Sequence, residues 1–151
     1  MKKSPKDSEL YDNLQPSKFT GDGFLGTDTR PVAEIIASDK RKLEELGLDN
    51  EGLSAKLDDA FIKAQEALGA EVQIKQGVSA VYYESRGRIP SPFKGEGTFE
   101  KGEVVITEIN TGERIIITRL SIHLIEKHGF FQGAGSRYRL DPGKAVKLLF
   151  S

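Results

Sequence analysis

Cysteine is absent from the chain, and histidine occurs only twice. The lack of cysteine excludes disulfides, thiolate zinc sites and a cysteine nucleophile, and it suits a reducing compartment. The sequence also lacks any run near the ~18 consecutive apolar residues that a membrane span needs. The basic N-terminal residues are not followed by the apolar stretch of a secretory signal. We therefore expect a cytoplasmic protein that does not enter a membrane.

The motifs of common catalytic sites are missing as well. The sequence has no Gly-x-Ser-x-Gly elbow, no His-Glu-x-x-His helix, no Walker lysine–serine pair and no GxGxxG opening a helix. Most carboxylates fall on the solvated faces of predicted helices. Glu84 and Glu108 fall in predicted strands, but nothing sets a distance between them, so an acid–base pair is not indicated. The sequence leans against an enzyme and predicts no cofactor.

Charge of either sign is not in large excess, since the formal net charge is −1. The chain therefore has no overall field that would attract nucleic acid or an anionic membrane. The distribution is uneven, with 10 Lys and Arg against 14 Asp and Glu over residues 1–70, a net −4. Residues 71–151 carry 12 against 9, a net +3. The C-terminal half is thus the one expected to meet an anion.

The chain of 151 residues is long enough for one domain with a single core. Residues 1–20 are polar and contain two prolines, which predicts a flexible tail, with a docked extended arm as the alternative. Residues 21–151 are predicted to form one α+β domain. Its first part, residues 21–70, carries two apolar stripes at helical spacing, which predicts a helical hairpin. The first helix begins near Pro31 and stops at Gly47, and the second follows Asp49 or Asn50, with the stripe Leu53, Leu57, Phe61, Ala64 and Leu68.

From residue 71 the apolar period changes to two, which predicts a mostly antiparallel sheet of about five strands. Apolar residues on both faces of 103–109 and 113–119 predict a central pair that is covered on both sides. A proline-containing loop is expected over 85–97. The other predicted elements are strands at 72–75, 78–85 and 98–100, a short helix from 121 to 128, a possible last strand at 137–140 and a terminal helix from Pro142.

A glycine-rich loop after residue 128 is the leading candidate for a ligand site. Glycines expose backbone N–H groups, Ser136 offers a hydroxyl, and Arg137 and Arg139 can clamp an anion. His128 lies just before this loop. The alternative is a plain connector whose phenylalanines fill the core.

The two histidines, His123 and His128, are five residues apart. On a regular helix this spacing separates them by about 140°, so we do not expect them to share an ion, and no metal site is predicted. The helix dipole at the C-terminus is enough to explain His128. A ligand-binding or catalytic role for His128 is the alternative.

A third candidate surface follows the second predicted strand. Tyr82 and Tyr83 should face opposite ways, so one ring packs and the other is exposed. Tyr82 with Arg86 and Arg88 is predicted to form a surface suited to ligand, RNA or protein, with a strand end and a solvated loop as the alternative. The helical hairpin has helix-turn-helix spacing, but residues 50–68 carry a net −2, which argues against contact with DNA phosphates.

Two runs carry a family resemblance. They are Phe24-Leu25-Gly26-Thr27-Asp28-Thr29-Arg30 and the stretch from His128-Gly129-Phe130-Phe131-Gln132-Gly133 through Tyr138-Arg139-Leu140-Asp141-Pro142. With the helices between them, they resemble small bacterial proteins known as hypothetical cytosolic proteins. The resemblance covers residues 21–151. It implies a bacterial, cytosolic origin and carries over no activity and no functional residue.

These observations favour a small binding or accessory domain that recognises an anionic small molecule or a protein partner through its C-terminal half. A nucleic-acid-binding module and an enzyme using His128 are the alternatives. The sequence leaves the oligomeric state open.

Overall fold

The computed structural model describes residues 5–15 and 23–150 of the chain, with side chains from residue 9 onward in those ranges. These residues form five helices and six strands, in the order α1 (Pro5–Asn13), α2 (Val32–Glu45), α3 (Asn50–Glu66), β1 (Val72–Lys75), β2 (Val78–Tyr83), β3 (Arg88–Pro90), β4 (Thr98–Glu100), β5 (Glu103–Glu108), β6 (Arg114–Thr118), α4 (Arg119–His128) and α5 (Pro142–Phe150). The α+β class is confirmed. None of the described helices combines the length and the apolar character needed to cross a bilayer.

The strands form two antiparallel sheets rather than one. The central sheet has the order β1-β2-β5-β6, and β3 pairs only with β4. The segment expected to be only a loop, 85–97, therefore contains a short strand. Proline lacks an N–H for the ladder, so the strand ending at Pro90 fits a small peripheral ribbon and not the central sheet. Residues 137–140, a possible last strand, are not extended.

Local signals place most helix ends where the sequence predicts them. The Asp49 carboxylate accepts a hydrogen bond from the Gly52 N–H at 2.7 Å and caps α3. Thr118 and Ser121 form a reciprocal capping box that begins α4, two residues earlier than expected. Gly129 ends α4 in the left-handed conformation, with φ of 63°. The capping box and Gly129 hold α4, and with it both histidines, in a defined position.

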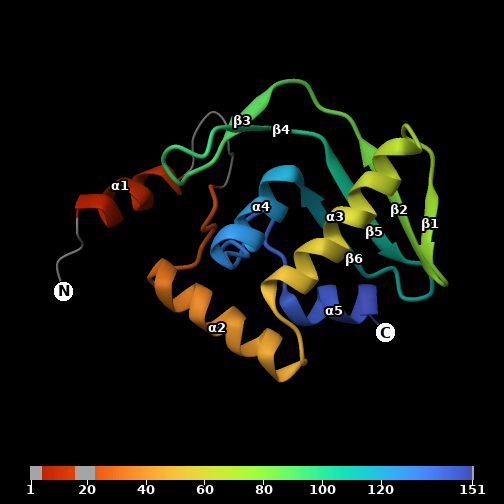
Figure 1. Cartoon of the computed structure of the whole chain (residues 1–151), viewed down its shortest axis with the longest axis horizontal. Coiled ribbons are helices and arrows are strands. Elements are labelled where there is room, and N and C mark those ends of the chain that lie inside the picture. The colour runs from red at the N-terminus through yellow and green to blue at the C-terminus, as the bar shows by residue number, and fades with distance from the viewer. Residues whose placement is uncertain (1–4, 16–22, 151) are drawn as a thin grey trace.

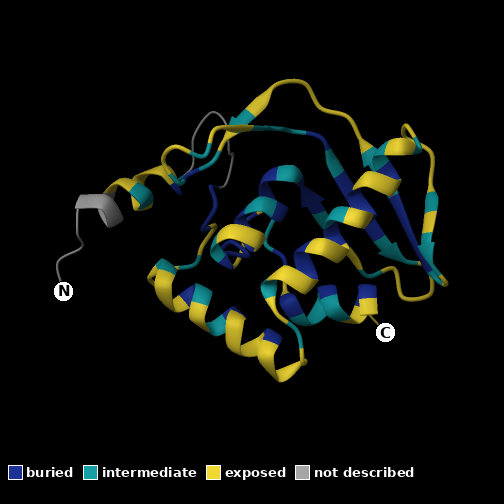
Figure 2. Ribbon diagram, viewed as in Figure 1, coloured by how far each residue is buried: buried dark blue, intermediate teal, exposed yellow. Residues whose placement is uncertain are grey.

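The buried side chains form two clusters (Figure 2). The larger cluster lies between the central sheet and α3, α4 and α5, and its sheet contribution comes from alternate residues such as Val104, Ile106, Ile115 and Ile117. The smaller cluster joins α1, α2 and α4 and comprises Leu14, Phe24, Leu25, Ile35, Leu120, Leu124 and Phe130. α4 contributes to both clusters, so its two ends are fixed by different parts of the fold.

Among the residues that the structure describes, the central strand pair is covered on one face and not on both. Val81, Val105 and Ile116 are paired across the sheet, are only half-buried, and belong to neither cluster. Their β-branched side chains shield one another along this face instead. Leu68, expected in the apolar stripe of α3, is 89% exposed, because the helix has already ended at Glu66.

The predicted helical hairpin is matched only in part. α2 packs against α5, whereas α3 packs on the central sheet and against α4 (Figure 1). The two helices are thus consecutive without being each other's main partner.

The N-terminal region differs from the expected flexible tail between residues 5 and 15. Residues 5–13 form α1, and Leu14 is fully buried in the smaller cluster. Leu10 and Leu14 are four residues apart, which places both on the side facing that cluster. The rest of the predicted tail, 1–4 and 16–20, lies outside the described residues.

Candidate metal centre

A single carboxylate joins both histidines of the chain. His123 Nε2 lies 2.9 Å from Glu96 Oε1, and His128 Nε2 lies 2.7 Å from Glu96 Oε2. Glu96 comes from the loop between β3 and β4, whereas both histidines belong to α4. One ligand atom from each of the three residues lies within 4.8 Å of the other two. Their side chains are between 18% and 26% exposed, so the cluster is shielded but reachable.

The angular separation of the histidines on the helix does not keep their rings apart. The ring centroids of His123 and His128 are 6.3 Å apart, and the two ring planes are nearly perpendicular, at 78°. An imidazole projects several ångströms from the helix axis, and Glu96 enters the space between the two rings. A spacing of five residues fixes only the directions in which the two Cβ atoms leave the helix and not where the ring nitrogens lie, so the sequence does not predict this convergence.

Aromatic rings and a hydroxyl hold the cluster in place. Phe93 stacks on His128 with ring centroids 3.6 Å apart and planes at 11°. Phe99 lies against His123 at 4.7 Å between centroids. The Ser91 hydroxyl donates to Glu96 Oε1 at 2.8 Å, and the same oxygen of Ser91 accepts from the Phe93 N–H. Residues near Glu96 therefore set the position of both the carboxylate and one imidazole.

The electrostatics keep Glu96 ionised. Burial by itself would raise the pKa of the Glu96 carboxyl, but hydrogen bonds from His123, Ser91 and His128 outweigh it and lower the pKa below its usual value. An ionised carboxylate only accepts hydrogen bonds, so both Nε2 atoms carry the donated proton in this arrangement. The site presents an anionic oxygen pair between two imidazoles.

A groove of about 390 Å³ opens beside the cluster. Glu96 and His128 line it together with residues 9, 10 and 13 of α1 and the 92–94 segment. Asn13 Nδ2 donates to the Pro92 carbonyl at 2.9 Å, which ties the end of α1 to the opposite wall. His123 is not part of the lining. The groove therefore reaches the cluster at Glu96 and His128.

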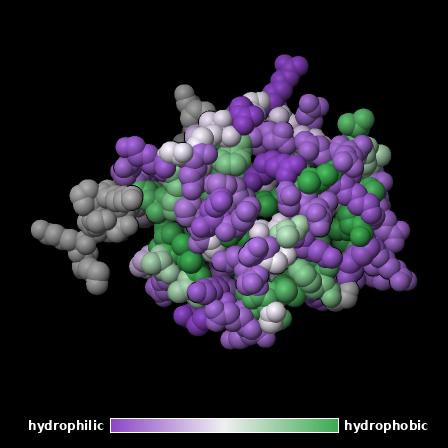
Figure 3. Space-filling model, viewed as in Figure 1, coloured by the Kyte–Doolittle hydropathy of each residue, from purple (hydrophilic) through white to green (hydrophobic). Residues whose placement is uncertain are grey.

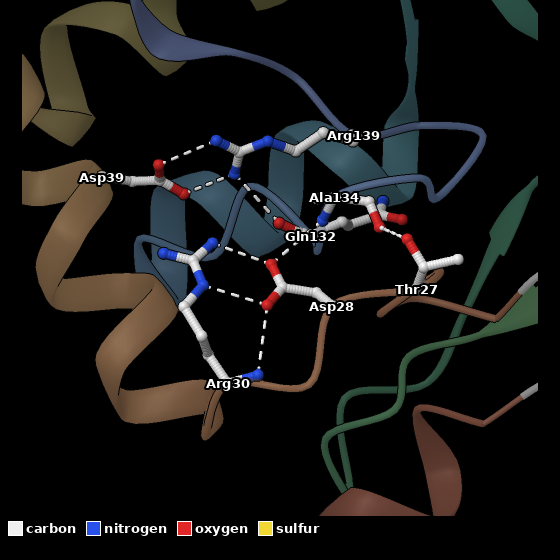
Figure 4. A network of polar contacts seen from close by, with 7 residues as sticks. All are labelled: Thr27, Asp28, Arg30, Asp39, Gln132, Ala134 and Arg139. Carbon is white, nitrogen blue, oxygen red and sulfur yellow. Dashed lines mark hydrogen bonds and ion pairs between the residues drawn. The ribbon is translucent and has the colours of Figure 1, made fainter.

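The arginines of the predicted anion loop are both paired with carboxylates. Arg139 Nη2 lies 2.9 Å from Asp39 Oδ1, with Asp39 buried on α2 (Figure 4). Arg137 Nη2 lies 2.9 Å from Glu103 Oε1, where Glu103 also accepts from the Tyr138 hydroxyl. A hollow of about 340 Å³ borders Arg139, and its lining balances the charges of Arg139, Arg41 and Lys42 with the carboxylates of Asp39, Glu45 and Asp141. Neither guanidinium is left with a free charge for an anion.

The glycine-rich loop packs instead against the segment that begins the domain. The Gly133 N–H donates to the Phe24 carbonyl at 2.8 Å, and the Thr27 N–H donates to the Ala134 carbonyl at 2.9 Å. The Ser136 hydroxyl is buried, 3.0 Å from the Gly23 carbonyl oxygen. The two runs that carry the family resemblance thus lie side by side, and their glycines serve close backbone contact rather than a ligand.

Asp28 is the central polar residue of this junction. Its carboxylate accepts from the Arg30 side chain at 2.9 and 2.7 Å and from the Ala134 N–H at 3.1 Å (Figure 4). The Arg30 hydrogen bonds hold the pKa of the Asp28 carboxyl far below its usual range, against the opposing effect of burial. Asp28 therefore joins the two segments as an anion.

The tyrosine–arginine surface is arranged differently from the sequence-based assignment. Tyr82 packs against Phe61, with ring centroids 5.8 Å apart, whereas Tyr83 is 54% exposed. One tyrosine packs and one is exposed, as predicted, but the exposed ring is not the one assigned to the site. Arg88 donates to the Thr98 side chain and carbonyl, both at 2.8 Å, and Arg86 is exposed. The three predicted residues do not gather into one site.

Comparison of the chain with protein-family models, with curated proteins and with solved structures finds no match. The fold and the cluster therefore define the class of the protein by themselves: an α+β domain with a His–His–Glu cluster at the mouth of a groove. The resemblance to hypothetical cytosolic proteins stays a prediction. Glu96, the residue that assembles the cluster, was missed because it lies in a loop without period, 27 residues from the first histidine.

Proposed function

We propose that the protein binds a divalent transition-metal ion, with Zn²⁺ as the leading candidate, through His123, His128 and Glu96. The observation that carries this proposal is the convergence of both Nε2 atoms on one carboxylate at the end of a groove. Two imidazoles and one carboxylate are a donor set that proteins use for zinc with an open fourth position. The same set also suits Fe²⁺ and other first-row ions, which follow the usual affinity order.

The dimensions of the cluster support the proposal. Zinc–nitrogen and zinc–oxygen bonds of about 2.0–2.2 Å place tetrahedral ligand atoms about 3.3 Å apart. The three ligand atoms already lie within 4.8 Å of one another, so side-chain rotations that move them by about 1 Å bring them to one ion. The ion would replace the two Nε2 protons, and each imidazole would then carry its proton on Nδ1. Binding therefore releases protons where an imidazole was charged and weakens as the pH falls.

The chain offers an unusually direct test, because it has two histidines and no cysteine. Long-range ¹H–¹⁵N spectra of the imidazoles contain only four ring nitrogens. On titration with ZnCl₂ we expect both rings to change together, with Nε2 taking the shift of a metal-bound nitrogen and Nδ1 that of a protonated one. Binding measured by calorimetry should saturate at one ion per chain.

Substitutions then assign the ligands. His123→Ala and His128→Ala should each weaken Zn²⁺ binding roughly 100-fold, the share of one ligand in the free energy of a protein zinc site. Glu96→Gln keeps the shape of the side chain and removes its charge, so it should also weaken binding. Glu126→Gln is the matched control, because Glu126 is an exposed carboxylate on the same helix outside the cluster. Unchanged imidazole spectra in Zn²⁺, or wild-type affinity in either alanine variant, would refute the proposal.

A further inference from the structure

The lining of the groove beside the cluster is partly apolar and partly charged. Leu10 of α1, Pro92 and Phe93 provide apolar surface, and Lys94 supplies a positive charge at the rim. The Lys94 side chain is 84% exposed and lies 3.9 Å from Glu9 Oε1, a distance at which an exposed pair contributes little. An anion in the groove therefore competes with Glu9 for Lys94 at small cost.

The open side of the cluster faces this groove. Glu96 and His128 line the groove and His123 does not, so a fourth ligand that comes from the groove reaches the ion past Glu96 and His128. The ring of Phe93 is stacked on His128 and also forms part of the wall. The part of a ligand next to its metal-bound atom therefore lies against apolar surface.

We infer that the groove binds a small monocarboxylate with an apolar chain, whose carboxylate completes the coordination of the ion and whose chain lies along Leu10, Pro92 and Phe93. This inference rests on the proposed metal site. The carboxylate is a ligand for the ion and a partner for Lys94, and the groove volume of about 390 Å³ suits a molecule of this size. A dicarboxylate or a sugar acid would leave its polar end against apolar walls, which is unfavourable.

Cobalt(II) separates this inference from the metal site itself. The first measurement is the visible spectrum on addition of CoCl₂, in which a d–d band reports binding of the ion to the three side chains. The Co²⁺-loaded protein is then titrated with acetate, butyrate and hexanoate. We expect each acid to change the band, with affinity rising up to about fourfold for each added methylene that is buried.

Two variants test the walls and the rim. Lys94→Glu should weaken binding of all three acids roughly two- to tenfold, because it replaces a weak attraction with a weak repulsion, while leaving Co²⁺ binding in place. Leu10→Ala should leave acetate binding unchanged and reduce the gain from butyrate to hexanoate. Lys40→Glu, on the exposed face of α2, is the matched control for a change of surface charge. Circular dichroism of each variant checks that the helices are retained.

The outcomes are distinguishable. Absence of any d–d band overturns the metal site and this inference with it. A normal band that no carboxylate alters, or an affinity that does not depend on chain length, overturns the ligand inference and leaves the metal site standing. Equal effects of Lys94→Glu and Lys40→Glu would also reject the groove as the binding place.

Discussion

The close contact between the segment that begins the domain and the glycine-rich loop after α4 makes a graded prediction for three glycines. A Cβ at Gly133 would lie 2.8 Å from Leu25 Cα and 2.9 Å from Asp28 Cβ, and closer still to the Leu25 carbonyl oxygen. Gly133 has no left-handed backbone, so only the overlap opposes alanine there. Two of the three obstructing atoms are backbone atoms and cannot rotate away. Overpacking of this kind costs about 1–3 kcal/mol.

Gly112 provides the opposite case. Its φ is 76°, and a Cβ there would meet nothing within 4 Å. Gly112→Ala therefore carries only the cost of a left-handed alanine, about 1 kcal/mol. Gly26 combines both effects, because its φ is 57° and its Cβ would lie 2.6 Å from the Ala134 carbonyl oxygen and nearer to the Ser136 nitrogen. The two costs together amount to about 2–4 kcal/mol.

The assay is urea unfolding of the three alanine variants with the wild type. We expect the loss of stability to increase from Gly112→Ala through Gly133→Ala to Gly26→Ala, with the last close to the sum of the other two. In thermal unfolding, each kcal/mol should lower Tm by about 2–4 °C for a chain of this size. If Gly26→Ala destabilises the protein no more than Gly112→Ala, the two segments do not approach each other as described.

Three further predictions concern the same framework. Asp28→Asn should cost about 2 kcal/mol at neutral pH, because the carboxylate accepts charge-assisted hydrogen bonds from Arg30. The pKa of Asp28 is lowered in the folded state, so this contribution is complete at pH values above the ordinary pKa of 3.8 and is lost as the pH falls further. In urea unfolding, the difference in free energy of unfolding between wild type and variant should therefore be smaller at pH 2.5 than at pH 7. An equal difference at both pH values would contradict the prediction. Leu14→Ala should cost about 2–5 kcal/mol in chemical denaturation, because the side chain is fully buried, and a negligible loss would mean that α1 is not docked. Asp39→Ala leaves Arg139 partly buried without its carboxylate and should cost about 3–5 kcal/mol, whereas the double variant with Arg139→Met should recover much of the loss in the same assay; purely additive losses would show that the two residues are not coupled.

The distribution of polar and apolar residues over the surface explains why the sequence does not reveal the groove. Most of the visible face is hydrophilic, with hydrophobic residues in separate patches (Figure 3). The groove at Glu96 and His128 is one place where apolar walls meet the proposed metal ligands. No compositional signal marks such a place, because its apolar residues come from α1 and from the loop before β4, which are far apart in the chain.

The candidate site could be predicted only in part from the sequence. His128 was singled out, and its place at the end of a helix was predicted correctly. Its hydrogen-bond partner in the cluster, Glu96, lies 32 residues away in a loop that has no hydrophobic period. The arginines of the glycine-rich loop looked available for an anion because their carboxylates, Asp39 and Glu103, are 100 and 34 residues away. Charge pairing over such separations leaves no pattern in a single sequence.

The sequence by itself determined the local structure of this protein: the amphipathic period of α3, the alternation of the central strands, the cap at Asp49 and the stop at Gly129. These features depend on hydrogen bonds and side-chain directions within one or two turns, so neighbouring residues suffice to specify them. The tertiary structure alone decided that α1 docks, that one face of the sheet stays half-exposed, and that Glu96 meets both histidines. Each of those outcomes depends on which distant side chains share a buried space, and that is set only when the whole chain folds.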